Sequence, residues 1–157
     1  MKKEIKQKRY ERLYKQLQEL LLPVSEPTSR MSTIAALLHH KFKYYFWTGF
    51  YRLIQDELLV GCYQGPLACL KLKKNTGVCW KAIKEQKSII VPNVHQFPGH
   101  IACDSRSNSE IVVPIKNFQN KLVAVLDVDS KDFDAFDKID QLNLENIVKL
   151  IYKNVSK

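Results

Sequence analysis

The sequence predicts an α+β fold, in which a central antiparallel sheet has N- and C-terminal helices packed on one face. Two observations predict this class. Apolar residues recur at helical spacing over about residues 3–40 and again over about 134–155. Between them, at about 44–133, β-prone segments follow one another across short polar turns, which is typical of antiparallel strands. A chain of 157 residues has the size of one domain with its own core, so we expect a single domain, 1–157.

Two helices are predicted at the N-terminal end. Residues 3–22 carry apolar side chains three and four positions apart, and Pro23 ends this pattern. A second helical stretch begins at Ser25, with Pro27 near its first position, and continues to about His40. Helices with one apolar face need an apolar surface to pack against.

The middle of the chain predicts several strands, one short helix and one long loop. Strand-like segments are found at 44–51, 58–63, 67–72, 88–91, 110–115 and 122–129. A short helix is predicted over 77–86 and a polar loop over 92–108, and loops of this length inside compact domains usually carry function. The last helix, 134–155, has one apolar stripe and completes the α+β arrangement.

Charge and hydropathy argue against several classes of protein. The net charge is +9 at pH 7, and much of it comes from the first fifteen residues. A solvated helix face explains these basic residues better than a nucleic-acid site does. No apolar run reaches the ~20 residues that a membrane span needs, and the charged N-terminus lacks the apolar region of a signal peptide. We therefore expect a cytoplasmic protein with no nucleic-acid partner and no membrane partner.

The cysteines are candidates for redox chemistry. The chain has four of them: Cys62, Cys69, Cys79 and Cys103. In a reducing cytoplasm they are not expected to form a structural disulfide framework, which leaves core thiols, metal ligands or redox catalysts. His95 and His100 could join them around zinc, but no Cys-x-x-Cys pair is present, so no metal site is predicted.

Cys103 is the first candidate for a reactive thiol. It lies in the polar loop, where solvent can reach it, and Arg106, His100 and His95 could supply the positive charge that favours a thiolate. The alternative is an ordinary half-buried cysteine, because free cysteines are among the most buried residues.

A thiol enzyme that reduces its substrate needs a second cysteine, which condenses with the sulfenic acid formed on the first. Cys69 lies at a turn-to-strand junction, and Cys79 lies at the start of the short predicted helix. A helix N-terminus lowers the pKa of a thiol, so Cys79 is also expected to be reactive.

Acidic and aromatic residues predict a pocket for a small molecule. Asp127 and Asp129 are two apart on a strand and share one face, and Glu110 joins them if the neighbouring strands pair. Three carboxylates suit an ammonium group, and one with a raised pKa could donate a proton. Trp47 and Tyr51 share a face of another strand, as an apolar wall for a methylthio group would. The alternatives are a solvated strand end for the acids and core packing for the rings.

These residues belong to longer motifs between about residues 45 and 133. The motifs are Trp47-Thr48-Gly49-Phe50-Tyr51, Gln64-Gly65-Pro66-Leu67-Ala68-Cys69, Thr76-Gly77-Val78-Cys79, Asn93-Val94-His95-Gln96-Phe97-Pro98-Gly99-His100-Ile101-Ala102-Cys103-Asp104, Ser107-Asn108-Ser109-Glu110-Ile111-Val112-Val113-Pro114 and Val125-Leu126-Asp127-Val128-Asp129-Ser130. In their order and spacing the chain resembles the free methionine-(R)-sulfoxide reductases, which are single GAF-domain proteins. The run from Gly99 to Asp104 is the most specific, because GAF domains that only sense ligands lack it.

The resemblance implies a reaction and a set of site residues. Cys103 resembles the family nucleophile, Cys69 the main resolving cysteine and Cys79 the third thiol of the pattern. The positions that line the substrate pocket correspond to Trp47, Tyr51, Glu110, Asp127 and Asp129. The implied substrate is free methionine-(R)-sulfoxide and the implied reductant is thioredoxin, with no metal, flavin or nucleotide cofactor. Whether the chain forms a homodimer is left open.

Three features depart from the family pattern. Trp80 replaces a usual glycine after the third cysteine, Cys62 replaces a usual proline, and the segment Lys71–Asn75 is unusually basic. The alternative function is a GAF module that senses a small ligand without turnover. Such a sensor would need neither Cys69 nor Cys103.

Overall fold

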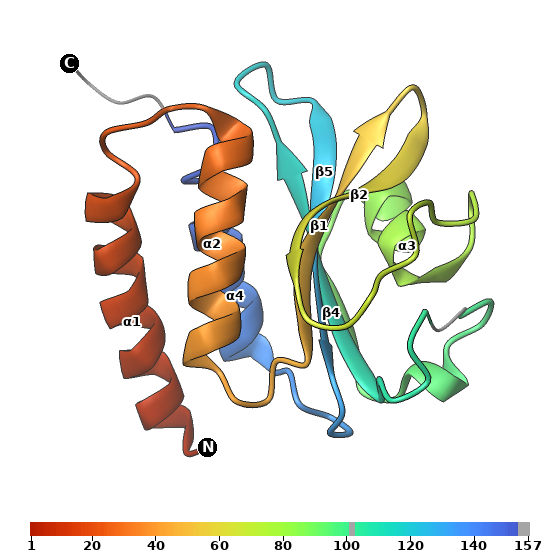
Figure 1. Ribbon diagram of the computed structural model, residues 1–157. Helices are drawn as coiled ribbons and strands as arrows, with labels where there is room; N and C mark the ends of the chain where they lie inside the picture. Colours follow the sequence, from red (N-terminus) through yellow and green to blue (C-terminus); the bar gives the residue numbers. More distant parts are fainter. Residues whose placement is uncertain (101–102, 154–157) are drawn as a thin grey trace.

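The computed structural model describes residues 1–100 and 103–153, and it places a central sheet between helices (Figure 1). The helices are α1 (Lys3–Leu20), α2 (Pro27–Lys41), α3 (Gly77–Glu85) and α4 (Lys138–Val148), with one 3-10 turn, η1 (Val94–Gln96). The strands are β1 (Trp47–Ile54), β2 (Glu57–Gln64), β3 (Ile89–Val91), β4 (Ser109–Lys116) and β5 (Leu122–Ser130). Within the described residues all pairings are antiparallel, in the order β2-β1-β5-β4-β3. The predicted α+β fold is confirmed.

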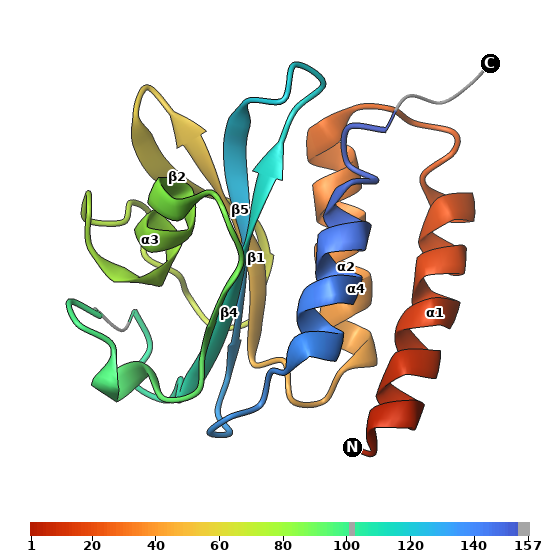
Figure 2. The ribbon, with the colours of Figure 1, turned by 180° about the vertical axis from the view of Figure 1, so that it is seen from behind.

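The terminal helices and α3 lie on opposite sides of the sheet (Figures 1 and 2). α2 and α4 lie against one face, α1 lies on their outer side, and α3 lies on the other face. The core between the sheet and helices α1, α2 and α4 contains large, fully buried side chains, among them Tyr10, Phe42, Phe50, Ile111, Leu126 and Leu144. A second apolar cluster lies between α3 and the sheet. Among the described residues no helix is long and apolar enough to cross a membrane.

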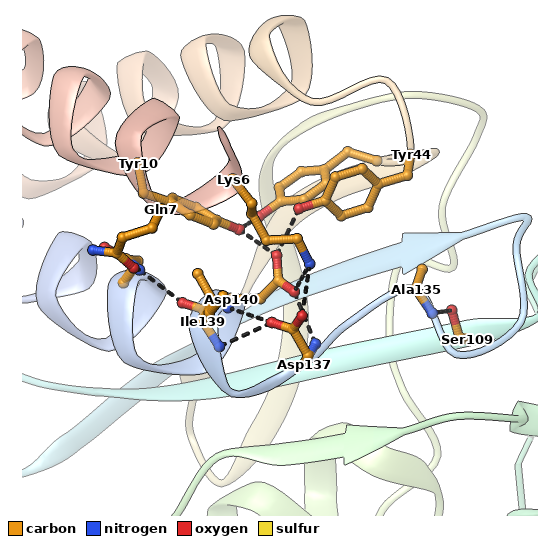
Figure 3. Close-up of polar contacts among 11 residues, drawn as sticks. Lys6, Gln7, Tyr10, Tyr44, Ser109, Ala135, Asp137, Ile139 and Asp140 are labelled. Atoms are coloured by element: carbon orange, nitrogen blue, oxygen red, sulfur yellow. Dashed lines mark hydrogen bonds and ion pairs between the residues drawn. The ribbon is translucent and has the colours of Figure 1, made fainter. Parts of the chain in front are cut away.

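One lysine of the basic N-terminal segment is buried. Lys6 is 5% exposed, and its Nζ donates to Asp140 Oδ2 at 2.7 Å and to Asp137 Oδ2 at 3.2 Å. The other carboxylate oxygen of Asp140 accepts from the hydroxyl groups of Tyr10 at 2.7 Å and Tyr44 at 2.6 Å (Figure 3). This network attaches α1 to α4. The prediction of a fully solvated basic face is therefore wrong at Lys6.

The strand predicted at 44–51 begins at Trp47 because the two residues before Phe46 belong to the helical core. Tyr45 is 4% exposed and its hydroxyl lies 2.6 Å from that of Tyr10. Tyr44 bonds Asp140. Burying these rings among the helices fixes the backbone in a turn, so the β-prone composition does not become strand there.

The strand predicted at 67–72 does not form. One isolated bridge, between Leu59 and Lys71, joins this segment to β2. Leu67 and Leu70 are 83% and 79% exposed, whereas Ala68 and Leu72 are partly buried against the cluster under α3. The apolar composition predicted a strand, but the two exposed leucines have no packing partner that would hold the whole segment on the sheet.

The last helix is shorter than predicted. The Asp137 side chain accepts from the backbone N–H of Asp140, and the Asp140 side chain accepts from the backbone N–H of Asp137. This capping box makes Lys138 the first helical residue. The helix ends at Val148. The predicted continuation to 155 includes residues 154 and 155, which lie outside the described residues.

The register of the sheet brings acidic and aromatic side chains together. Asp129 on β5 lies opposite Glu110 on β4 and opposite Trp47 on β1. Asp127 precedes Asp129 by two residues on β5, and Tyr51 follows Trp47 by four residues on β1. Because side chains alternate between the faces of a strand, all five project from the face that carries α3.

Candidate active site

A cavity of about 210 Å³ opens on the α3 side of the sheet. Its lining comes from β1, β4 and β5, from α3, from the segment 67–73 and from the long loop. All eight residues predicted for the site line it: Trp47, Tyr51, Cys69, Cys79, Cys103, Glu110, Asp127 and Asp129. The fold thus brings together residues that are up to 82 positions apart in the chain.

Cys69 and Cys103, which both line this cavity, form a disulfide. Their Cα atoms are 5.6 Å apart, although 34 positions separate them in sequence. Cys103 is exposed and Cys69 is half-buried. The hydroxyl of Tyr51 donates to the backbone carbonyl of Cys69 at 3.1 Å, which ties this cysteine to β1. The pair is consistent with redox-active cysteines.

The positive charges expected near Cys103 are engaged elsewhere. Arg106 makes two side-chain bonds to Asp104, at 2.9 and 2.7 Å, and these bonds lower the pKa of Asp104 to about 2. His95 Nε2 lies 2.7 Å from Asn108 Oδ1. Burial lowers the pKa of His100, and His95 lowers it further, so His100 is neutral near pH 7. The expectation that these three residues supply free positive charge to Cys103 is not supported.

Three carboxyl groups share the inner end of the cavity, as the sequence predicted. Glu110 and Asp127 are 5% and 6% exposed, and Asp129 is partly exposed. Burial raises the pKa of Asp127 to about 6, while contacts with Glu110 and Cys79 act in the opposite direction. Burial and then the charges of Asp127 and Asp129 raise the pKa of Glu110 well above its usual range. Near pH 7 the group can therefore hold both a proton and negative charge.

Cys79 is a buried thiol and not an activated one. It is 4% exposed and has no disulfide. Burial raises the pKa of the thiol well above its usual value, and the charges of Asp127, Glu110 and Asp129 raise it further. These effects outweigh the N-terminus of α3. The prediction that the helix terminus lowers the pKa of Cys79 is wrong.

Aromatic rings form an apolar wall beside the acids. The ring centroid of Trp47 lies 5.8 Å from that of Tyr51 and 5.3 Å from that of Tyr63, and both pairs are stacked. A Cβ atom at Gly49 would meet Tyr63 Cβ and lie 2.6 Å from Trp47 Cη2. The absence of a side chain at Gly49 therefore leaves room for the indole ring of Trp47. Sequence reasoning did not identify Tyr63, because its position on β2 becomes relevant only once β1 and β2 pair.

Unpaired polar atoms point to a polar ligand. Among the described residues, three buried side-chain atoms have no hydrogen-bond partner: Trp47 Nε1, His100 Nε2 and Asp127 Oδ1. All three residues line the cavity. Buried polar groups are nearly always paired in folded proteins, so a ligand with both donors and acceptors would complete these atoms. His100 was not predicted as a pocket residue, although it lies in the run from Gly99 to Asp104.

The inner end of the cavity has the chemistry to hold a cation. The carboxylates suit an ammonium group. Cys79, Glu110 and Asp127 also offer ligand atoms that lie within 4.8 Å of one another. This set differs from the histidine and cysteine set considered from the sequence, because it is drawn from α3, β4 and β5.

Comparison with known proteins gives one consistent result. The GAF domain family matches residues 32–152. The free methionine-R-sulfoxide reductase of Escherichia coli is 40% identical over 129 residues, which cover 80% of this chain and 78% of that protein. The same reductase from Neisseria meningitidis, solved in complex with its substrate, has a TM-score of 0.86 and 34% identity over 91% of this chain and 86% of that one. The fRMsr of Staphylococcus aureus in its reduced form has a TM-score of 0.88 and 42% identity, over 94% and 95% of the two chains.

Proposed function

Because the chain belongs to the GAF-domain family of free methionine-R-sulfoxide reductases, we propose that it reduces free L-methionine-(R)-sulfoxide to L-methionine through Cys103 and Cys69. The chain is thus an oxidoreductase of this family. The reaction assigned to Cys103 and Cys69, and thioredoxin as the reductant, are our proposals.

The residues that line the cavity support this proposal most directly. It contains a cysteine pair close enough to bond, a cluster of three carboxyl groups and a wall of aromatic rings. Free methionine sulfoxide has an ammonium group, a carboxylate, a polar sulfoxide and a methyl group. Each kind of group therefore has a counterpart in the lining, and the unpaired atoms of Trp47, His100 and Asp127 support a ligand of this polarity.

The first step is attack on the substrate sulfur. With the disulfide reduced, the thiolate of Cys103 attacks the sulfoxide sulfur, the oxygen is transferred to Cys103, and methionine leaves. Cys103 then holds a sulfenic acid. Trp47 and Tyr51 would face the methyl end of the substrate, since aromatic faces suit apolar and sulfur-bearing groups.

Protonation of the sulfoxide oxygen needs an acid that still carries its proton near pH 7. Glu110 and Asp129 are both candidates, because burial and acidic neighbours raise the pKa of each well above its usual range. We propose Glu110, because it is more deeply buried than Asp129. Asp127, with a pKa of about 6, is mostly ionised at pH 7 and would bind the substrate ammonium by charge-assisted hydrogen bonds.

The second half of the cycle restores the thiols. The Cys69 thiol attacks the sulfenic acid, water leaves, and the Cys69–Cys103 disulfide forms. Exchange with a dithiol protein then returns both cysteines to the reduced state. Cys103 is exposed, and the neighbouring Leu67 and Leu70 give an incoming thioredoxin an apolar contact. We propose the cytoplasm as the compartment, because thioredoxin keeps thiols reduced there.

The proposal is tested by measuring methionine formation from the separated R and S sulfoxides of free methionine, with dithiothreitol as reductant. We expect turnover of the R form only. If neither form is reduced while the R form binds, the sensor function would apply instead, although a sensor has no need for the Cys69–Cys103 pair.

A further inference from the structure

Three different elements direct metal-binding atoms towards one point inside the cavity. Cys79 comes from α3, Glu110 from β4 and Asp127 from β5. One sulfur and two carboxylate oxygens lie within 4.8 Å of one another. The three side chains are 4–6% exposed. A buried group of this composition differs from the solvated acidic clusters that are common on protein surfaces.

Within the described part of the chain, the carboxylates of the cluster make no ion pair. The ion pairs found there involve other acids, and Asp127 Oδ1 is buried without a hydrogen-bond partner. Buried anions are costly unless they are paired or bind a cation. A divalent cation would neutralise these carboxylates with strong and directional bonds.

We propose that Cys79, Glu110 and Asp127 form an inhibitory site for a thiophilic divalent cation such as Zn²⁺. The metal–sulfur bond forms as the Cys79 S–H bond breaks, and the carboxyl proton of Glu110 is lost as its oxygen binds the metal. Both protons pass to solvent, and no electron is transferred. Three protein ligands leave a fourth position that faces the cavity, where water can bind. Mg²⁺ and Ca²⁺ are excluded, because both require oxygen ligands in larger number.

The bound cation would inhibit by occupying carboxylates that the substrate needs. This competition rests on the proposed function, since it assumes that Glu110 and Asp127 contact methionine sulfoxide. Binding of the metal itself does not. It requires no turnover and no reduced Cys69 or Cys103, so failure of metal binding and failure of the reductase activity are separate results.

The experiment uses the full chain in its disulfide form, in which Cys62 and Cys79 are the free thiols. Zn²⁺ is titrated by calorimetry, and Co²⁺ serves as the spectroscopic probe. We expect one Zn²⁺ per chain and a sulfur-to-cobalt charge-transfer band, with no heat from Mg²⁺ or Ca²⁺. Cys79→Ser should lose the band, and Asp127→Asn should weaken Zn²⁺ binding by at least about tenfold, the effect seen on removing even outer-shell partners.

Cys62→Ser is the matched control. Cys62 Sγ lies 3.6 Å from the carbonyl of Thr28 on α2, on the face of the sheet opposite α3. In this variant Cys79 is the remaining free thiol, so a charge-transfer band assigns the sulfur ligand even if Cys79→Ser does not fold.

Three results would each overturn the site: no Zn²⁺ binding by the wild type, loss of the band in Cys62→Ser, or a band retained in Cys79→Ser. Free methionine should raise the apparent Kd for Zn²⁺, and no effect of methionine would overturn the inhibition.

Discussion

The exposed sulfur of Cys103 has no substitute in the proposed reaction. Cys103→Ser should abolish methionine formation with dithiothreitol, because a hydroxyl group does not ionise near pH 7 as a thiol does. We expect a loss of at least about a thousandfold, in line with removal of a nucleophile that acts with its partners as a unit. Cys62→Ser is the control and should keep its rate. A rate near that of the wild type in Cys103→Ser would exclude the mechanism.

Cys69 acts only after the substrate has been reduced, so its loss should have a different signature. Cys69→Ser should release about one methionine per chain in a single turnover and then stop under thioredoxin, with Cys103 left oxidised. Quenched-flow measurement of methionine and mass spectrometry of Cys103 check this. Continued cycling with thioredoxin would make Cys79 or Cys62 the resolving thiol.

Asp127 should make stability depend on pH, and the sign follows from its raised pKa. Below about pH 4 this carboxyl is neutral in the folded and unfolded chain, so burying it carries no ionisation cost. As the pH rises through about 6, the folded protein must ionise a buried group, whereas the unfolded chain has already done so. Stability from this group is therefore present at low pH and is lost above pH 6.

Asp127→Asn keeps the shape and removes that ionisation. At pH 8 the variant should be more stable than the wild type by about 1–3 kcal/mol, and near pH 4 the difference should be small. Its kcat/KM should fall, because the charge-assisted contact with the ammonium is weakened. Urea unfolding of the disulfide form at both pH values gives the comparison. An equal difference in stability at pH 4 and pH 8 would contradict the raised pKa.

At the scale of elements, α1 depends on one buried ion pair. Lys6→Met leaves Asp140 buried without its cation, although Tyr10 and Tyr44 still donate to it. We expect a loss of about 3 kcal/mol in the free energy of unfolding. Lys8→Met is the matched control on the same helix: its pair with Glu4 is exposed, so it should cost less than about 0.5 kcal/mol. Equal effects in urea unfolding would show that Lys6 does not anchor α1.

The loop predicted at 92–108, of which residues 101 and 102 lie outside the described residues, should differ between the redox states. Substrate must reach Cys103 before the disulfide closes, so the loop should be open in the reduced protein and drawn towards Cys69 in the oxidised one. Pro98-Gly99 is the expected hinge, because glycine absorbs large changes in φ and ψ, and Gly99 has a φ of 75°.

Hydrogen exchange on both redox forms tests this movement. Amides of the loop should gain protection on oxidation, while those of α1 should hardly change. Identical exchange across the loop in the two states would mean that the thiols already lie within bonding distance in the reduced protein.

For the whole molecule, periodicity predicted the elements that one local pattern determines. The amphipathic helices, the antiparallel strands and their α+β arrangement follow from which side chains must be buried. The errors lie where distant contacts override composition. Tyr44 bonds Asp140, and Lys6 bonds the same residue 134 positions away. In the segment 67–72, Leu67 and Leu70 remain exposed. Trp80, a departure from the family pattern, is 6% exposed in the cluster under α3 and causes no visible disruption.

The eight residues of the site could be predicted because the family motifs carry them, and the pairing of β4 with β5 adds Glu110 to the two aspartates. Their electrostatics could not. The pKa of Cys79 depends first on burial and then on carboxylates from β4 and β5, and the positive charge of Arg106 is paired with Asp104. The unpaired His100 Nε2 is likewise visible only after the chain folds around it.

Because several elements of the fold enclose the cavity, we expect the enzyme to prefer the free amino acid to an N-acetylated one. β1, β4, β5, α3 and two loops contribute to the lining, so the substrate's ammonium must approach a buried carboxylate cluster. N-acetylmethionine-(R)-sulfoxide has no ammonium, and its acetyl group would bring an uncharged amide against Asp127. Its kcat/KM with the wild type should be lower by at least about a hundredfold, since a buried anion left unpaired costs about 3 kcal/mol or more.

Parallel assays of the free and acetylated R sulfoxides with dithiothreitol measure this ratio. Asp127→Asn should narrow it, because the amide side chain no longer demands a cation. Equal rates for the two substrates would show that the carboxylates do not bind the ammonium group.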